Sequence, residues 1–307
     1  MQIQRSARGI LTTLLAVSAI VAWGHDARTS ERNARAPLAH EWRLVAGRHW
    51  QIASPPGEAL ETTDAAEGNR GACPPGMVDV RGKMKVSPAL DDLQTTTCLK
   101  WVEKEQGKRC AEYDRKKWLE VSGSLATRDM RFCIDRFEYP NRKGEYPLIV
   151  VNFYEGGLLC GGQKKRLCSE DEWTFACEGE EAQPYPNGYT RDADACVTDH
   201  APRRYDEAAL RFRSEDRAMR ELDKLWQGEP SGARPNCKSP FGVYDMTGNV
   251  DEWTKSTAPG RASILKGGYW GPVRTRCRPS TRAHGEAFTF YQQGLRCCAD
   301  PGSLRGE

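Results

Sequence analysis

The stretch that decides the fold is Phe241–Thr254, which reads FGVYDMTGNVDEWT. Glycines at positions 242 and 248 interrupt it, so it is typical of turns and short strands rather than of one long element. The rest of the chain is punctuated in the same way, with 29 Gly and 18 Pro among its 307 residues. Few segments have helical spacing. We therefore expect an α+β fold with short strands and much irregular loop.

One helix start is clear upstream of this stretch. Ser169-Glu170-Asp171-Glu172 is a capping box, in which the Ser169 hydroxyl accepts from the Glu172 amide and the Glu172 side chain reaches back. The helix that follows is predicted to present Trp173, with Ala176 or Cys177, to the core at helical spacing.

Four further segments have interpretable patterns. Residues 153–160 are predicted to form a shorter helix, and residues 77–80 to open the domain as a strand. The charged stretch 90–131 is interpreted as an insertion held by a disulfide. Residues 205–226 are predicted to form an amphipathic surface helix. That prediction rests on four spaced apolar residues, Phe212, Met219, Leu222 and Trp226.

Three segments together resemble the formylglycine-generating enzyme, or sulfatase-modifying factor, family. They are Lys165–Ala176, Phe241–Thr254, and Lys266–Gly268 with Gly294–Cys297 near the end. The resemblance runs from about residue 73 to residue 300. It implies a variant of the C-type lectin fold, loop-rich and stapled by disulfides, in a domain expected over residues 71–307.

The cysteines indicate the compartment. There are 12, with no Cys-x-x-Cys pair, so zinc ribbons and thioredoxin-type redox sites lack their spacing. Disulfides would be stabilising in an oxidising compartment. The resemblance implies two of them: Cys160 with Cys297, and Cys177 with Cys277. Closeness in the sequence and to the motifs favours two more: Cys98 with Cys110, and Cys196 with Cys237.

The resemblance also implies a calcium site. In the family, a turn of this type wraps calcium through two side chains and two backbone carbonyls. The matching residues here are Asp245, Gly248, Val250 and Glu252. Calcium prefers hard oxygen ligands, and a glycine lets the loop bend its carbonyls inward. The alternative is that Asp245 caps a turn and Glu252 pairs with a surface base. A second calcium site of the family is not expected, because Lys224 stands at its side-chain ligand position.

Active members of the family oxidise a cysteine of a peptide substrate to formylglycine, using copper(I) held by two cysteines. A soft monovalent metal needs thiolate ligands. In those enzymes both cysteines lie between the Lys-Gly-Gly strand and a following Arg-x-Arg-Cys segment. Here residues 268–276 read GYWGPVRTR and contain no cysteine, and this loop is shorter than the family pattern; Cys277 belongs to an implied disulfide. Cys298 lies at the wrong end of the loop, so we expect no copper site.

An iron site is not favoured either. Some relatives bind non-haem iron through histidines of a separate helical domain. The five histidines of this chain are His25, His40, His49, His200 and His284. They contain no His-x-x-x-His pair, and two histidines that met in space would be too few ligands.

A binding surface is the other candidate site. Tyrosine, tryptophan, arginine and histidine side chains near the shortened loop combine aromatic rings with cations, which suits a peptide or a sugar face. They are Tyr269, Trp270, Arg274, Arg276 and His284. The alternative for Trp270 is that it fills the space left by the shortened loop.

The N-terminus predicts export. Arg5 and Arg8 precede an apolar run, Ile10–Trp23, that is short for a membrane span. We expect residues 1–24 to be a signal peptide, or else a retained anchor, and residues 25–70 to be a flexible tether. The alternative for His40–Ile52 within the tether is that this segment forms a strand or docks on the domain. The 45 Lys+Arg and 42 Asp+Glu leave a net charge of +3, so a nucleic-acid partner is not indicated.

These observations favour an exported binding or structural module of the cell envelope, periplasmic or extracellular. We expect it to be stabilised by calcium and to bind an extracytoplasmic peptide, protein or glycan, without copper-dependent formylglycine formation. Membrane contact is expected only through the N-terminal segment. The alternative is a divergent metal-dependent oxidoreductase that modifies an extracytoplasmic protein.

Overall fold

The computed structural model describes residues 37–54, 73–104 and 107–302. The expected signal peptide or anchor (1–24) and the tether residues 25–36 and 55–70 lie outside the described residues. Within the described part of the chain, no helix is both long enough and apolar enough to cross a bilayer.

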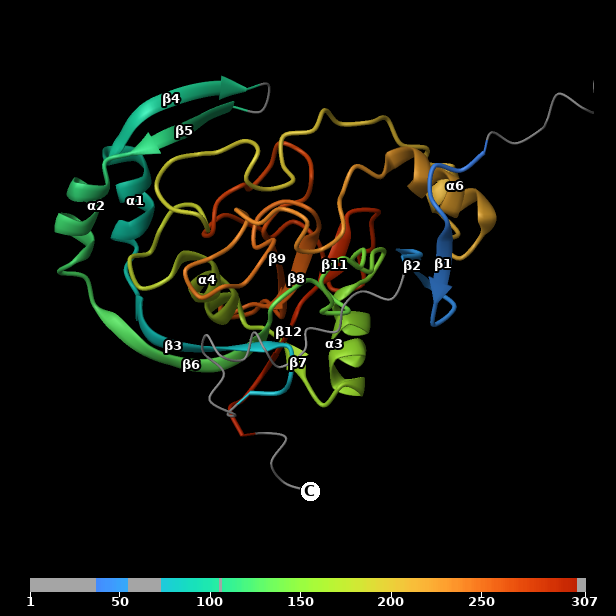
Figure 1. Cartoon of the computed structure of the whole chain (residues 1–307), viewed down its shortest axis with the longest axis horizontal. Coiled ribbons are helices and arrows are strands. Elements are labelled where there is room, and N and C mark those ends of the chain that lie inside the picture. Colours follow the sequence, from blue (N-terminus) through green and yellow to red (C-terminus); the bar gives the residue numbers. More distant parts are fainter. Residues whose placement is uncertain (1–36, 55–72, 105–106, 303–307) are drawn as a thin grey trace, which may run out of the picture. The chain divides into compact units, whose positions relative to one another are not determined.

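One antiparallel sheet has the strand order β3-β6-β12-β7. Its strands are β3 (Met77–Lys85), β6 (Thr127–Asp135), β12 (Cys297–Ala299) and β7 (Arg166–Leu167). The long β3–β6 ladder curves along the lower edge of Figure 1. Val80 and Phe132, paired across it, are 0% and 1% exposed and pack against the helix that follows Ser169. The predicted strand at 77–80 is thus the start of β3.

The second sheet has the order β10-β9-β8-β11. Its strands are β8 (Asp251–Lys255), β9 (Ser263–Lys266), β10 (Ser280–Thr281) and β11 (Gln293–Leu295). β11 runs parallel to β8, and the other pairs are antiparallel. The Phe241–Thr254 stretch therefore supplies a turn followed by a central strand of this sheet.

The insertion between β3 and β6 forms a small layer of its own (Figure 1). It contains α1 (Ala89–Thr96), β4 (Cys98–Lys104), β5 (Gly107–Tyr113) and α2 (Arg115–Ser122). Trp118 is 0% exposed and packs with Tyr113 and Tyr189. A disulfide joins Cys98 to Cys110 across the β4–β5 hairpin, so the insertion is pinned as expected.

Two helices begin at capping boxes. α4 (Glu170–Glu178) starts at Ser169, whose Oγ accepts from Glu172 N while Glu172 Oε2 accepts from Ser169 N. The prediction for this helix is confirmed. α3 (Phe153–Gly162) starts in the same way at Asn152 and confirms the shorter helix.

The single helix predicted over 205–226 is wrong. The structure has a short α5 (Glu207–Leu210) and a separate α6 (Asp216–Leu225). Phe212, which lies between them, is 52% exposed rather than part of the core stripe. Leu222 is buried as expected.

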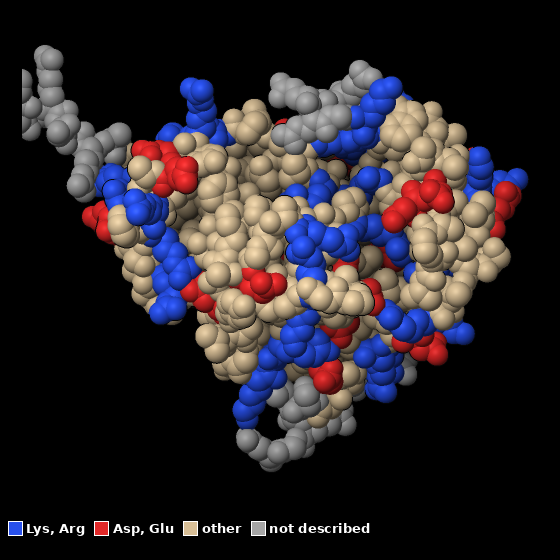
Figure 2. Space-filling model, turned by 180° about the vertical axis from the view of Figure 1, so that it is seen from behind, with Lys and Arg blue, Asp and Glu red and all other residues tan. Residues whose placement is uncertain are grey.

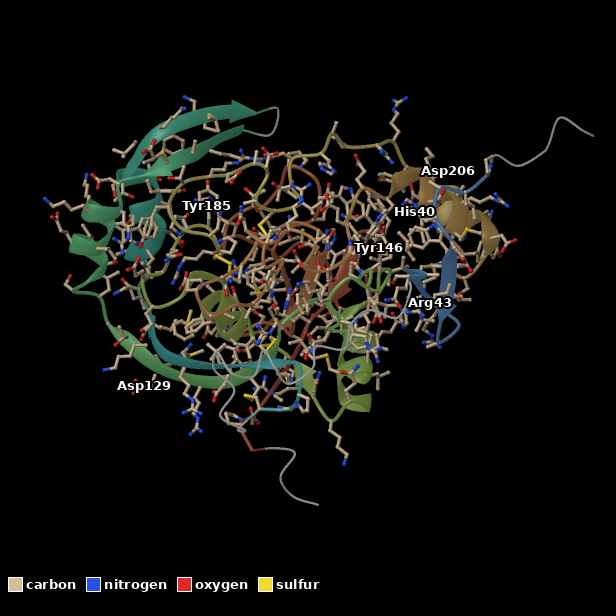
Figure 3. All side chains as sticks on the ribbon, in the orientation of Figure 1. His40, Arg43, Asp129, Tyr146, Tyr185 and Asp206 are labelled. Carbon is tan, nitrogen blue, oxygen red and sulfur yellow. A yellow bond between two sulfur atoms is a disulfide. The ribbon has the colours of Figure 1, made fainter. Side chains whose placement is uncertain are left out.

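Part of the expected tether is a hairpin. β1 (Trp42–Val45) pairs antiparallel with β2 (His49–Ile52), and the four residues of β2 are buried. The amide and carbonyl of Trp50 exchange hydrogen bonds with those of Ile149. His40 lies beside Tyr146, close to α6 (Figure 3). A flexible tether over 25–70 is therefore wrong for residues 42–52, because their apolar side chains join the core.

Candidate metal centre

The turn that precedes β8 is held by backbone contacts. Gly248 N donates to Gly267 O at 3.0 Å, and Asn249 N donates to Val197 O at 2.9 Å. Gly248 has φ +83°, and a Cβ there would lie 2.3 Å from Val197 O. Only glycine fits this close approach, because any side chain would push the turn away from Val197.

Glu252 lies inside the protein and is paired with Arg296. Arg296 Nη2 donates to Glu252 Oε1 at 2.9 Å, and Trp173 Nε1 donates to Glu252 Oε2 at 2.7 Å. Arg296 also donates to the carbonyls of Asp135 and Tyr244. The surface base expected as the alternative partner of Glu252 is thus a fully buried guanidinium.

Glu138 is a third carboxylate in this region, and sequence reasoning missed it. It is 0% exposed. Its carboxylate accepts three hydrogen bonds: from Ser231 Oγ at 2.8 Å, Asn249 Nδ2 at 2.7 Å and Val250 N at 3.2 Å. Burial, with the charges of Asp245 and Glu252, raises the pKa of Glu138. Because Glu138 is far from the turn in sequence, no local pattern could have indicated it.

Asp245 is also buried, with 4% exposure, and has φ 56°. Its Oδ2 accepts from Gly232 N at 2.7 Å. Burial raises the pKa of Asp245 to about 7. Glu138, Asp245 and Glu252 are three carboxylates against the single buried guanidinium of Arg296, so the ionised cluster has surplus negative charge.

This cluster fits calcium in charge and in donor type. Asp245 supplies carboxylate oxygen, and among the described residues no group donates a hydrogen bond to the carbonyls of Gly248 or Val250. The fit is less good at Glu252, where Arg296 already neutralises the carboxylate. Within the described ranges, no three His, Cys, Asp or Glu side chains are arranged to hold a metal by themselves. Backbone carbonyls would therefore have to complete such a site.

The loop after β9 turns Trp270 into the core. Trp270 is 2% exposed, with ring centroids 4.9 Å from Trp226 and 5.9 Å from Tyr291. Its amide donates to Asn249 O at 3.1 Å, which ties the loop to the turn before β8. Trp270 therefore fills the space under the shortened loop, and its expected place on a binding surface is wrong.

The other expected surface residues form two groups. Arg274 pairs with the buried Asp251, and its positive charge is a second, smaller influence on the pKa values of Tyr269 and His284 after burial. Burial is the larger cause in both and raises the pKa of Tyr269 above its ordinary value while lowering that of His284. Arg276 instead donates to Tyr113 Oη at 3.2 Å, against the insertion.

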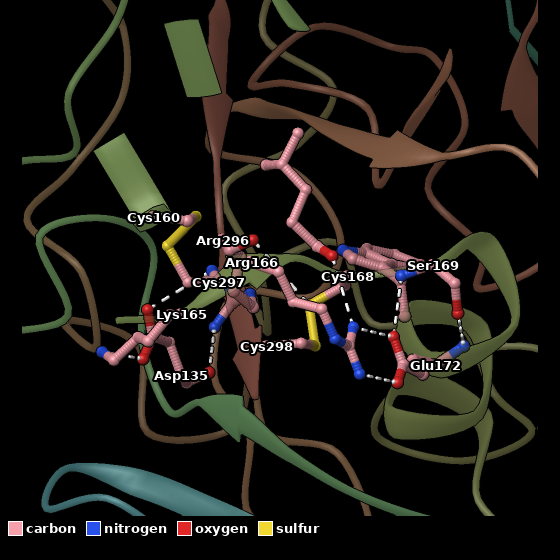
Figure 4. The surroundings of a disulfide bond; sticks show 12 residues. Asp135, Cys160, Lys165, Arg166, Cys168, Ser169, Glu172, Arg296, Cys297 and Cys298 are labelled. Carbon is pink, nitrogen blue, oxygen red and sulfur yellow. Dashed lines mark hydrogen bonds and ion pairs between the residues drawn. A yellow bond between two sulfur atoms is a disulfide. The ribbon is translucent and has the colours of Figure 1, made fainter. Parts of the chain in front are cut away.

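All 12 cysteines are in disulfides. The bonds are Cys73–Cys133, Cys98–Cys110, Cys160–Cys297, Cys168–Cys298, Cys177–Cys277 and Cys196–Cys237. Figure 4 shows the neighbouring Cys160–Cys297 and Cys168–Cys298 bonds between Lys165–Asp135 and Arg166–Glu172 ion pairs. With no thiol left, the side chains do not fit copper(I), which needs thiolate.

The comparisons with known proteins agree with this geometry. Residues 96–301 match the family model of the sulfatase-modifying factor enzyme 1-like domain, FGE-sulfatase. The chain belongs to this family. Its α+β, C-type-lectin-like fold is that of the family, and the cysteine-free loop at 268–276 lies within the matched residues.

Two curated relatives carry the same name. Inactive C-alpha-formylglycine-generating enzyme 2 of Bos taurus is 30% identical over 175 residues, covering 54% of this chain and 54% of that protein. The Mus musculus protein is 30% identical over 170 residues, covering 52% and 51%. The chain thus spans about half the length of these relatives. The crystal structure of CarF aligns with a TM-score of 0.45 and 12% identity, covering 73% of this chain and 97% of CarF.

Proposed function

We propose that this family member is an exported, non-catalytic binding module stabilised by calcium. It does not form formylglycine with copper. The name "inactive" borne by both curated relatives supports a non-catalytic role. Six disulfides without a free thiol are typical of a protein exported to an oxidising compartment, periplasmic or extracellular.

The burial of Trp270 in a loop without cysteine carries the non-catalytic part of the proposal. In active members the corresponding loop holds the two copper-binding cysteines. Here residues 268–276 contain no cysteine, and Trp270 packs against Trp226 instead. Gly268 has φ +74°, and a Cβ there would lie 2.3 Å from Val273 O. The loop is therefore a tight turn that packs Trp270 into the core, rather than a metal-binding segment.

Calcium would be held at the turn before β8, by Asp245 and the carbonyls of Gly248 and Val250, with Glu252 positioned by Arg296 and Trp173. The metal would supply positive charge to a buried cluster that has more carboxylates than cations. Its role here is structural, because β8 follows this turn directly.

A metal and activity measurement tests the proposal. Purified full-length protein is analysed for calcium, copper and iron, and a cysteine-containing sulfatase-type peptide is incubated with it and copper under air. We expect calcium without stoichiometric copper or iron, and no loss of cysteine mass beyond a protein-free control. Copper-dependent turnover, or stoichiometric iron, would instead establish the alternative, a divergent oxidoreductase.

A further inference from the structure

A cavity of about 560 Å³ lies between the insertion and the loop that contains β10. Its volume is in the range of small-molecule sites. The lining residues come from three segments: α1, the β4–β5 hairpin, and residues 276–282. Seen from behind, lysine and arginine side chains gather across the middle of the molecule (Figure 2).

The lining is strongly basic. It has five cationic side chains and one acidic side chain, Asp91. Part of this charge is neutralised by carboxylates from outside the cavity. Arg278 donates to Glu178 at 2.8 and 2.7 Å, and Arg282 pairs with Glu170 at 2.9 Å.

Arg276 differs from these arginines. Among the described residues its hydrogen-bond partner is the hydroxyl of Tyr113, and no carboxylate pairs with it. Arg109 pairs with Asp199, which Arg191 shares. Burial lowers the pKa of Arg109, and the charge of Arg276 acts in the same direction. Arg276 is therefore the one arginine of the four in the lining that no described carboxylate neutralises, and an oxyanion in the cavity would accept hydrogen bonds from it.

The uncharged residues of the lining indicate that the ligand has a ring and polar groups in addition to an anionic group. Trp101 is 46% exposed at the cavity, and Gln94 and Ser280 add amide and hydroxyl groups. An exposed indole beside hydrogen-bonding groups suits the face of a sugar ring, as guanidiniums suit a carboxylate or sulfate. An acidic peptide would use the arginines but would not need the indole.

We infer that this cavity binds an acidic saccharide, through guanidiniums on its carboxylate or sulfate and Trp101 on its ring. The inference deepens the proposed function, on which it rests, by naming a ligand class for the module. The Cys98–Cys110 disulfide holds Arg109 and the hairpin wall in place, which lowers the ordering cost of binding.

Calorimetric titration of the full chain tests the inference. The probes are a sulfated uronic-acid disaccharide, a neutral disaccharide, inorganic sulfate and an oligoglutamate peptide. We expect the acidic disaccharide to bind more tightly than the other three, with an affinity that falls as salt rises. Arg276→Gln should lower the affinity for the acidic disaccharide about tenfold. Arg282→Gln, at a position 54% exposed, should weaken it without affecting the fold.

Trp101→Ala should weaken the binding of the acidic disaccharide and leave the binding of sulfate unchanged. Arg204→Gln and Tyr154→Ala are matched controls, since both residues are exposed and lie outside the cavity lining, and both should bind like the wild type. Equal binding of the neutral disaccharide, or wild-type affinity in both arginine variants, would overturn the inference. Tighter binding of oligoglutamate would assign the cavity to an acidic peptide and also overturn it.

The two proposals fail separately. Copper-dependent turnover of the sulfatase-type peptide would overturn the proposed function whatever the titration shows. If the protein shows no turnover of the peptide and the acidic disaccharide does not bind, the saccharide inference is overturned while the proposed function stands.

Discussion

The guanidinium of Arg296 lies 2.9 Å from the carboxylate of Glu252, and the two side chains are 0% and 1% exposed. The pair joins β8 to the segment that links β11 and β12. Arg296→Met leaves a buried carboxylate without its cation and should destabilise the fold by about 3–5 kcal/mol in urea unfolding. The double variant Glu252→Gln/Arg296→Met removes both charges and should be less destabilised. A double variant worse than the single one would contradict a charge-based role.

The acid cluster predicts a pH dependence. Burial raises the pKa of Asp245 from 3.8 to about 7. Between these values the folded protein binds more protons than the unfolded chain, so the stability of calcium-free protein falls as pH rises from about 4 to about 7. Asp245→Asn should remove on the order of 2–4 kcal/mol of this pH-dependent loss. Urea unfolding with chelator across this interval checks it, and an unchanged slope in Asp245→Asn would refute it.

Calcium should reverse that loss in the wild type. Under the proposed function calcium binds the ionised form of the cluster, so added calcium should raise the thermal midpoint more at neutral than at acidic pH. Asp245→Asn should lose most of this response. Asp92→Asn, an exposed carboxylate on α1, is the matched control and should retain it. An equal response in the two variants would place the bound ion elsewhere.

The position of Trp270 predicts a packing effect. Trp270→Ala empties a buried site and should cost about 3–5 kcal/mol of unfolding free energy. Tyr269→Ala, at a half-buried neighbour, should cost less. Differential scanning calorimetry of both variants measures the difference. A Trp270→Ala variant with wild-type stability would return this side chain to a binding role.

The N-terminal hairpin depends on Asp223. Its carboxylate accepts from the amide of Ala39 at 2.7 Å and from Trp42 Nε1 at 2.9 Å. Asp223→Ala should cost about 1–3 kcal/mol and speed amide exchange over residues 42–52. Asp92→Ala serves as the control. Unchanged exchange in Asp223→Ala would show that other contacts hold the hairpin.

Local patterns were predictable from the sequence. The capping box at Ser169 determined the start of α4, because both of its hydrogen bonds lie within one helical turn. The turn with Gly248 was recognisable because it follows a family pattern. Long-range partners were not predictable. Glu138 enters the acid cluster from a loop distant in sequence, and no periodicity indicates where that loop packs.

Tertiary packing also overrode two sequence-based expectations. Residues 42–52 have little periodicity, and their hairpin is held by long-range contacts, from Ile149 to Trp50 and from Asp223 to Trp42. The stripe predicted over 205–226 was interrupted at Phe212, which is exposed, while α6 buries its own apolar face. The basic cavity was missed because its walls come from segments far apart in the chain.

The two adjacent cysteines of β12 link the register of this strand to the correct pairing of its disulfides. Cys297 lies opposite Leu167 and Cys298 opposite Arg166, and successive side chains of a strand point to opposite faces. Exchanging the two partners, Cys160 and Cys168, would need a slip of one residue, which would swap the faces of three residues that are all buried. A wrongly oxidised chain would therefore be unable to pack β12 between β6 and β7.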